Sequence, residues 1–365
     1  MRKILVSSLA FIFIYLMLHF SGYFSHNETS SYLTVISFLL ISIAVILSGC
    51  ELFANGVECI GDRLNLSHAT AGSLLAAVGT AMPETLIPIL ALIFGKGIHR
   101  ESIAVGAILG APFMLATLAF FFTGLTSLIL YLMKKRDKAV HYVNLSALKT
   151  ELLFFIIAMI VILIISYINN SLTDHITAVL LLLTYALFVK ITLNHRSEDG
   201  EEYTEHLHFS YIMSCPANNF WITLQTLTGL ALIVVGAHIF INFLTLLSIK
   251  SGLSSLVLAL LLAPVASELP EKFNSVIWTI KGKDTLALSN VTGAMVFQST
   301  IPVSIGLIFT QWHLGHTELL NIAFSLSMAV IVYITILTRK KLPSFMLMTG
   351  GIFYLIYILR IFVFM

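Results

Sequence analysis

The sequence predicts an all-α membrane protein with ten transmembrane helices, arranged as two inverted five-helix repeats, plus one extra N-terminal helix. Three observations lead to this fold class. The composition is dominated by apolar residues, apolar runs long enough to cross a bilayer recur along the whole chain, and a motif in the first half returns in the second half.

The composition excludes an ordinary soluble domain. Hydrophobic residues make up 58% of the 365 residues, charged residues only 10%, and the mean hydropathy is +0.97, whereas a soluble domain carries about a quarter charged residues. The formal net charge of +2 is too small to favour a nucleic-acid partner. Cys50, Cys59 and Cys215 lack metal-ligand spacing and are interpreted as small apolar residues rather than disulfide partners.

Apolar runs of about 20 residues indicate spanning helices, because backbone groups in lipid must be satisfied within their own segment. The length of the first run favours a retained helix over a cleaved signal peptide, and both interpretations stay open. The run 101–133 contains Gly106, Gly110 and Pro112, where we expect it to tilt or break. The runs lie at about 4–24, 33–59, 68–95, 101–133, 150–168, 174–192, 218–248, 253–281, 285–311, 317–338 and 343–364.

These runs divide the chain into four parts. They are an N-terminal hydrophobic helix with an outer linker (1–30), a first five-helix repeat (31–193), a polar linker (194–217) and a second five-helix repeat (218–365). If every run crosses, lysines and arginines gather in the loops of one side, which the positive-inside rule assigns to the cytoplasm. The polar linker lies on that side and is interpreted as a solvated connection, although its acidic residues and histidines also suit a regulatory cation site. We therefore predict an integral, multi-pass protein of the plasma (cytoplasmic) membrane.

The repeat is carried by motifs at a constant offset. The segment Gly49–Asn55 has a partner in Gly236–Asn242 (236 − 49 = 187), and Pro83–Glu84 has a partner in Pro270–Glu271 at the same offset. Five helices separate each motif from its partner, and because five is odd, the two halves must enter the membrane in opposite orientations. Inverted repeats of this kind hold their substrate near the bilayer midplane, where helices are interrupted by Gly or Pro.

Glu84 and Glu271 are the central candidate residues. Each lies well inside an apolar run, where a carboxylate costs about 2.5–3.5 kcal/mol and indicates a functional site. Two facing carboxylates in a low dielectric cannot both stay ionised without a cation or a proton. Thr80 and Ser267, one helical turn before each glutamate, add hydroxyl oxygens of the kind that hard cations prefer. The alternatives are structural: a buried carboxylate held by helix-end donors, and hydroxyls bonded back to their own helix.

The string Gly79-Thr80-Ala81-Met82-Pro83-Glu84 resembles the signature of the calcium/cation antiporter superfamily, the sodium/calcium exchangers and their relatives. The resemblance covers nearly the whole chain and implies alternating-access exchange of Ca²⁺ against Na⁺, or in relatives against H⁺. It also implies ligands on the helix after each glutamate, of which Gln298 is retained. This chain departs from the family by having no oxygen-bearing side chain at three further ligand positions, which are Ala111, Leu115 and Ala294.

Glu268 is an additional carboxylate, three residues before Glu271 and able to share its helix face. It either joins the site, as a ligand or proton carrier, or forms a salt bridge to Lys272, or faces the cytoplasm. The predicted metal-ligand set is therefore Thr80, Glu84, Ser267, Glu268, Glu271 and Gln298.

The sequence thus predicts a secondary active cation antiporter, with sodium/calcium exchange as the first hypothesis. Proton-coupled exchange is the alternative within the same class, favoured by Glu268 and the missing oxygens, and a cation-binding sensor that transports nothing is a third reading. An enzyme is disfavoured, because the chain contains no His-Glu-x-x-His, no paired intramembrane aspartates and no Gly-x-Ser-x-Gly with a partner histidine. No cofactor is expected; the expected partners are Ca²⁺ with Na⁺ or H⁺ as transported ions, and the lipid bilayer.

Overall fold

The computed structural model describes residues 31–63, 76–95, 97, 99–168, 170–195, 207–213, 215–339 and 341–364. Within these ranges, side chains are not described at 58, 61, 62, 76–83, 193–195, 212, 213, 270, 271, 362 and 364. The predicted N-terminal helix (1–30) and the middle of the polar linker lie outside the described residues.

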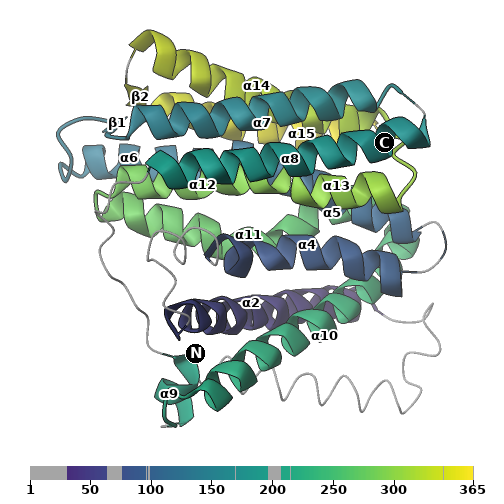
Figure 1. The fold of residues 1–365 in the computed structure, drawn as a ribbon. Helices are drawn as coiled ribbons and strands as arrows, with labels where there is room; N and C mark the ends of the chain where they lie inside the picture. Colours follow the sequence, from purple (N-terminus) through teal and green to yellow (C-terminus); the bar gives the residue numbers. More distant parts are fainter. Residues whose placement is uncertain are drawn as a thin grey trace. The chain divides into compact units, whose positions relative to one another are not determined.

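The described chain is almost entirely helical and forms two compact units (Figure 1). Unit 1 contains residues 1–104 and 193–267, and unit 2 contains residues 105–192 and 268–365. Each unit therefore draws on both halves of the sequence, and the division falls within α5 and within α11. The elements are α2 (Tyr32–Arg63), α4 (Ala76–Phe94), α5 (His99–Met114), the π-helix η3 (Leu115–Ala119), α6 (Phe120–Leu132), β1 (Val140–His141), α7 (Leu145–Ile165), α8 (Ser171–His195), α9 (His208–Met213), α10 (Asn219–Ser251), α11 (Ser255–Ile280), α12 (Asp284–Gln298), α13 (Ile301–Phe309), α14 (His316–Arg339), β2 (Leu342–Pro343) and α15 (Ser344–Phe364).

In unit 1, α2 and α10 cross in close contact over much of their length (Figure 1). Glycines at the crossing allow the two backbones to meet. A Cβ atom on Gly49 would lie 2.8 Å from the carbonyl oxygen of Gly229, and one on Gly229 would lie 2.6 Å from the backbone nitrogen of Phe53. Small residues at a helix crossing are the usual way in which membrane helices gain van der Waals contact.

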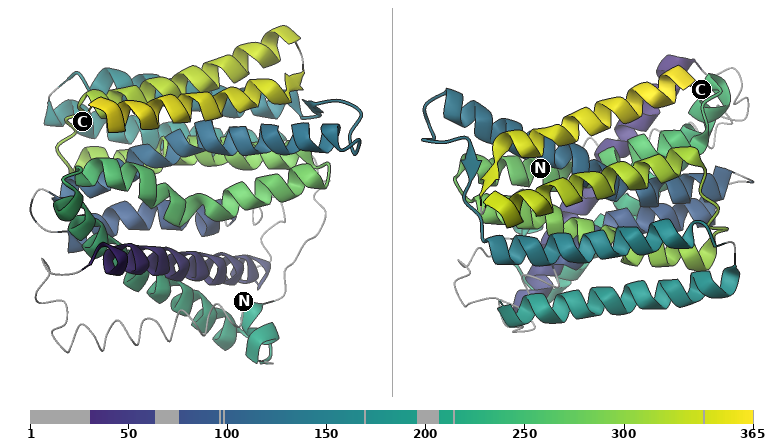
Figure 2. Two further views of the ribbon diagram at one scale, coloured as in Figure 1. Left: turned by 180° about the vertical axis from the view of Figure 1, so that it is seen from behind. Right: turned by 90° about the horizontal axis from the view of Figure 1, so that it is seen from above.

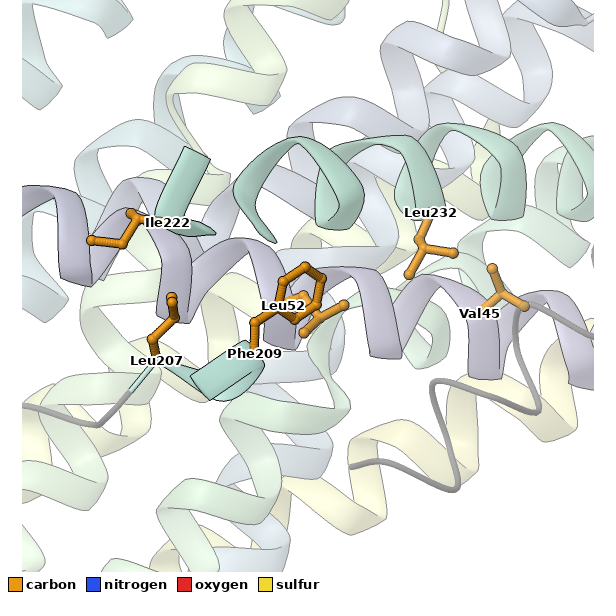
Figure 3. Packing of buried hydrophobic residues seen from close by; sticks show 6 residues of the cluster. All are labelled: Val45, Leu52, Leu207, Phe209, Ile222 and Leu232. Atoms are coloured by element: carbon orange, nitrogen blue, oxygen red, sulfur yellow. The ribbon is translucent and has the colours of Figure 1, made fainter. Parts of the chain in front are cut away.

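A buried cluster at this helix pair also holds the end of the polar linker (Figure 3). It consists of Val45, Leu52, Leu207, Phe209, Ile222 and Leu232. Polar bonds fix the same region: the side-chain oxygen of Asn55 accepts hydrogen bonds from the backbone N–H of His208 (3.0 Å) and from Nε2 of Gln225 (2.9 Å). The short helix α9 is therefore docked on the membrane helices, although it belongs to a stretch that the composition suggests is solvated.

In unit 2, α7 packs against α12 and α14, and α15 packs against η3, α6 and α14. Figure 2 shows these helices running side by side. Glycines again bring backbones together, since a Cβ atom on Gly350 would collide with the carbonyl oxygen of Thr117. The strands β1 and β2 form a small antiparallel pair in which Val140 is opposite Pro343 and His141 is opposite Leu342.

A buried ion pair fastens the two-stranded sheet to the helix ends. The guanidinium of Arg136 donates to both carboxylate oxygens of Asp284, at 2.9 Å and 2.5 Å, and to the carbonyl oxygen of Thr279 at 2.7 Å. The backbone N–H of Tyr142 donates to the same carboxylate at 2.9 Å. The loop after α6, the end of α11 and the start of α12 are thereby joined.

Two of the predicted apolar runs, 101–133 and 285–311, differ in the structure from the helices expected from the sequence. The run 101–133 does not break at Pro112; α5 continues through it, and the ladder shifts to π-helical bonding in η3 three residues later. A proline removes one backbone donor, and π-helix is found mostly as single turns inside α-helices, as η3 is here. The run 285–311 is divided at Ser299–Thr300, where the Thr300 hydroxyl donates to the carbonyl oxygen of Val296 (2.7 Å). The next helix, α13, begins at Ile301 and has Pro302 in its first turn.

Eight helices among the described residues are long and apolar enough to cross a membrane, and α4 and α11 contain further, shorter apolar stretches. Their outward faces carry large apolar side chains. On α8, for example, Leu180, Leu183 and Leu187 are all more than half exposed. The chain is therefore a multi-pass helical membrane protein, as the composition predicts.

Candidate cation site

Glu84 lies in α4 and is buried, with only 4% of its surface exposed. Its helix is built almost entirely from apolar residues and Pro83 directly precedes it, so the carboxylate is held away from bulk water inside an apolar segment. Thr80 belongs to the same helix one turn earlier, as predicted, but its side chain is outside the described residues. Placing a carboxylate in such a segment costs free energy, so Glu84 is a candidate for a functional role.

Ser267 lies on α11 and is also buried, and its hydroxyl donates to the carbonyl oxygen of Ala263 at 3.3 Å. This bond along the helix is the structural alternative anticipated for Ser267. Because a hydroxyl has one hydrogen but two lone pairs, the oxygen of Ser267 can still accept a hydrogen bond or bind a cation.

Glu268, the next residue on α11, has no exposed surface and forms an ion pair with Lys272. The ammonium nitrogen Nζ lies 3.1 Å from Oε2 of Glu268 and 2.7 Å from the sulfur of Met114. The salt bridge considered for Glu268 is therefore present. Lys272 is itself buried, so a fixed positive charge is held inside an apolar segment. Glu271 directly precedes Lys272 in α11, and its side chain is outside the described residues.

Gln298 is the last residue of α12 and is 1% exposed. Its side-chain oxygen Oε1 has no hydrogen-bond partner among the described residues. A buried amide oxygen without a partner is uncommon and requires an explanation such as an ion or a water molecule. Amide oxygens are among the ligands of hard cations, and the role of Gln298 as a ligand stays a prediction.

The predicted ligand set is divided between the two units. Thr80, Glu84 and Ser267 belong to unit 1, and Glu268, Glu271 and Gln298 belong to unit 2. Among the described residues, no group of three or more His, Cys, Asp or Glu side chains is arranged to hold a metal ion. The facing of Glu84 and Glu271 therefore remains a prediction from the repeat.

One buried carboxyl was not predicted from the sequence. Glu151 on α7 is 7% exposed, and its Oε2 lies 2.5 Å from the hydroxyl oxygen of Thr292 on α12. Thr292 directly precedes Gly293, in the stretch that leads to Gln298. The apolar run predicted from the sequence starts at about residue 150, so Glu151 lies at its edge. The helix in fact begins at Leu145.

Comparisons with known proteins bear on the family and the fold. The sequence profile of the family described as "Sodium/calcium exchanger protein" matches residues 33–194 and 221–365. CaxA of Alkalimonas amylolytica, provisionally named an antiporter, is 24% identical over 274 residues, which cover 74% of this chain and 79% of that protein.

Two solved structures share the fold. The crystal structure of the H⁺/Ca²⁺ exchanger CAX superposes with a TM-score of 0.71 and 16% identity, over 99% of this chain and 88% of that one. The sodium-calcium exchanger NCX_Mj superposes with a TM-score of 0.57 and 19% identity, over 90% of this chain and 99% of that one. At these identities the likeness establishes the fold alone.

Proposed function

The chain belongs to the sodium/calcium exchanger protein family, and from this premise we propose that it exchanges Ca²⁺ against protons, with Glu84 and Glu271 as the main ligands of the calcium ion. The family membership makes it an antiporter related to Na⁺/Ca²⁺ and H⁺/Ca²⁺ exchangers. The observation that carries the proposal is the burial of Glu84 within an apolar helix.

The repeat supports a paired site. The helix α10 (Asn219–Ser251) covers the residues that lie 187 positions beyond α2 (Tyr32–Arg63), to within one residue at its end (32 + 187 = 219; 63 + 187 = 250). Both Glu84 and Glu271 then fall inside helices, α4 and α11. The eight candidate spans among the described residues, together with the shorter apolar stretches of α4 and α11, are compatible with the ten spans predicted from the repeat. In an inverted repeat of that kind the substrate site is expected near the midplane, which is the basis for proposing Glu84 and Glu271 as a pair.

Calcium suits the proposed ligands, since it takes oxygen atoms from carboxylates, amides and backbone carbonyls. Glu84 and Glu271 supply the negative charge, and Thr80, Ser267 and Gln298 supply neutral oxygens. Exchange follows from shared carboxylates: an empty, doubly charged site is too costly to reorient, so protons or another cation must replace the departing calcium.

Lys272 favours the proton over sodium as the counter-ion. Its ammonium already neutralises Glu268 at 3.1 Å, so this carboxylate needs no mobile sodium ion. In addition, Ala111, Leu115 and Ala294 provide no oxygen where the resemblance implies sodium ligands. Sodium/calcium exchange across the plasma membrane is the second candidate, supported by the family description.

The test is uptake of radioactive calcium into proteoliposomes under an outward proton gradient and, separately, an outward sodium gradient. We expect proton-driven uptake that is lost in Glu84→Gln and in Glu271→Gln. Asp174→Asn, which changes a partly exposed acid in the first turn of α8, is the matched control and should transport normally. Uptake driven by sodium alone would establish the second candidate. Retained uptake in Glu84→Gln would refute the site, and calcium binding without uptake would indicate a sensor.

A further inference from the structure

The buried pair formed by Glu151 and Thr292 has a hydrogen-bond arrangement that depends on a proton. The Thr292 hydroxyl oxygen lies 2.5 Å from Oε2 of Glu151 and 2.9 Å from the carbonyl oxygen of Leu288. A threonine hydroxyl has a single hydrogen. If Glu151 is ionised, both neighbours are acceptors, and Thr292 can satisfy only one of them.

A protonated Glu151 satisfies both contacts. Its O–H donates to the oxygen of Thr292, and the Thr292 hydrogen goes to the carbonyl of Leu288, the usual partner four residues earlier in a helix. Glu151 is 7% exposed and Thr292 is fully buried, so little bulk water reaches the pair to satisfy the second acceptor. Because Glu151 lies in a membrane-spanning helix, its carboxyl is a candidate for a functional role and not only for a role in helix packing.

We propose that Glu151 is a second proton-binding site of the exchanger, which holds a proton in this conformation and releases it to water during transport. When the proton leaves, the carboxylate accepts the Thr292 hydrogen, and the Leu288 carbonyl loses that bond. The change is thereby transmitted to α12, the helix that ends at Gln298. Thr292 and Gln298 are six residues apart, about 9 Å along the helix, so protonation and the predicted cation ligand are linked through one rigid element.

The position of Glu151 gives the proton a short path. It is six residues beyond the start of α7 at Leu145, which places it about 9 Å from that end of the helix. The titratable groups on the packed elements are Lys149 on α7 itself, Asp284 on α12, Asp174, His175, Tyr185 and Lys190 on α8, and His316, Glu318, Tyr333 and Arg339 on α14. Asp284 is paired with Arg136, so its charge is already compensated.

Infrared difference spectroscopy of the full-length protein in lipid tests the protonation directly, without requiring transport. In the difference between the wild type and Glu151→Gln at neutral pH, we expect a carbonyl stretching band of a protonated carboxyl. Thr292→Val should shift that band by removing its partner, whereas Thr292→Ser, which keeps the hydroxyl, should leave it in place. Glu318→Gln changes a carboxyl of similar burial (8%) and is the matched control. A difference spectrum that contains only carboxylate bands would overturn the proposal.

The role in transport rests on the proposed exchange and has its own readout. If one proton at Glu151 is linked to exchange, the rate changes by up to about tenfold per pH unit in its titration range. This dependence should flatten in Glu151→Gln, a variant that keeps a donor toward Thr292. An unchanged pH profile would overturn the coupling. A wild type that transports nothing would refute the proposed function while leaving the infrared result valid, so the two failures can be told apart.

Discussion

Removal of the Lys272 ammonium should destabilise the protein strongly, because it leaves the Glu268 carboxylate buried without its cation. The two charged atoms are 3.1 Å apart and neither side chain is more than 8% exposed. At an effective dielectric constant of about 20, unit charges at that distance attract by roughly 5 kcal/mol. Removing one member of a buried pair costs about 3–5 kcal/mol in measured cases. We expect Lys272→Met to lower the free energy of unfolding by about 3–5 kcal/mol.

A double-mutant cycle separates the charge from the packing. The double variant Glu268→Gln/Lys272→Met has no buried charge, so it should recover most of the loss and show a coupling energy of at least about 1.5 kcal/mol. Unfolding in mixed micelles, followed by far-ultraviolet circular dichroism, measures all three variants. Lys341→Met removes an exposed lysine and should change stability by no more than about 0.5 kcal/mol. A double variant as unstable as Lys272→Met would refute the reasoning.

The same variant tests whether Lys272 replaces a mobile cation. Without its ammonium, the surroundings of Glu268 gain one net negative charge, which a monovalent cation can compensate. Ligand binding to the folded state alone stabilises it by about 2.7 kcal/mol at a concentration one hundred times Kd. Sodium should therefore stabilise Lys272→Met and leave the wild type nearly unchanged. An equal response of both proteins to sodium would show that the tethered ammonium does not take the place of an ion.

Two further predictions concern packing and ion pairing. Gly229→Ala places a Cβ atom 2.6 Å from the backbone nitrogen of Phe53, so α2 and α10 must separate at a cost of about 1–3 kcal/mol, measured as a lower thermal midpoint in detergent. Gly293→Ala, whose added Cβ meets no described atom within 4 Å, is its control, and equal effects would refute the argument from close contact. Arg136→Met leaves Asp284 buried at 2% exposure, with only the Tyr142 N–H still donating to it among these two groups. We therefore expect the free energy of unfolding to fall by about 3 kcal/mol. Adding Asp284→Asn should restore part of that stability, and no restoration would mean that the buried charge is not responsible.

Much of the fold follows from the sequence because the membrane restricts what a chain can do. Every spanning segment must satisfy its own backbone, so apolar length alone predicts most helices. The sequence does not reveal where a helix changes its local geometry. The π-turn after Pro112 and the division at Thr300 are local changes in backbone and hydroxyl hydrogen bonding, and the hydropathy of the run carries no signal for them.

In the candidate site, likewise, some residues are identified by the sequence pattern and others only by their contacts in the structure. Glu84 could be found because it lies in the middle of an apolar run and has a partner 187 residues later, two signals that a sequence carries. Glu268 could be noticed, but whether its charge is compensated by Lys272 depends on the rotamers of two buried side chains. Glu151 has neither signal: it lies near the edge of its run, and the residue 187 positions later is Thr338. Its significance comes from one hydroxyl on another helix, so a carboxyl near a helix end in a membrane protein must be judged by its hydrogen-bond partners and not by its depth in the sequence pattern.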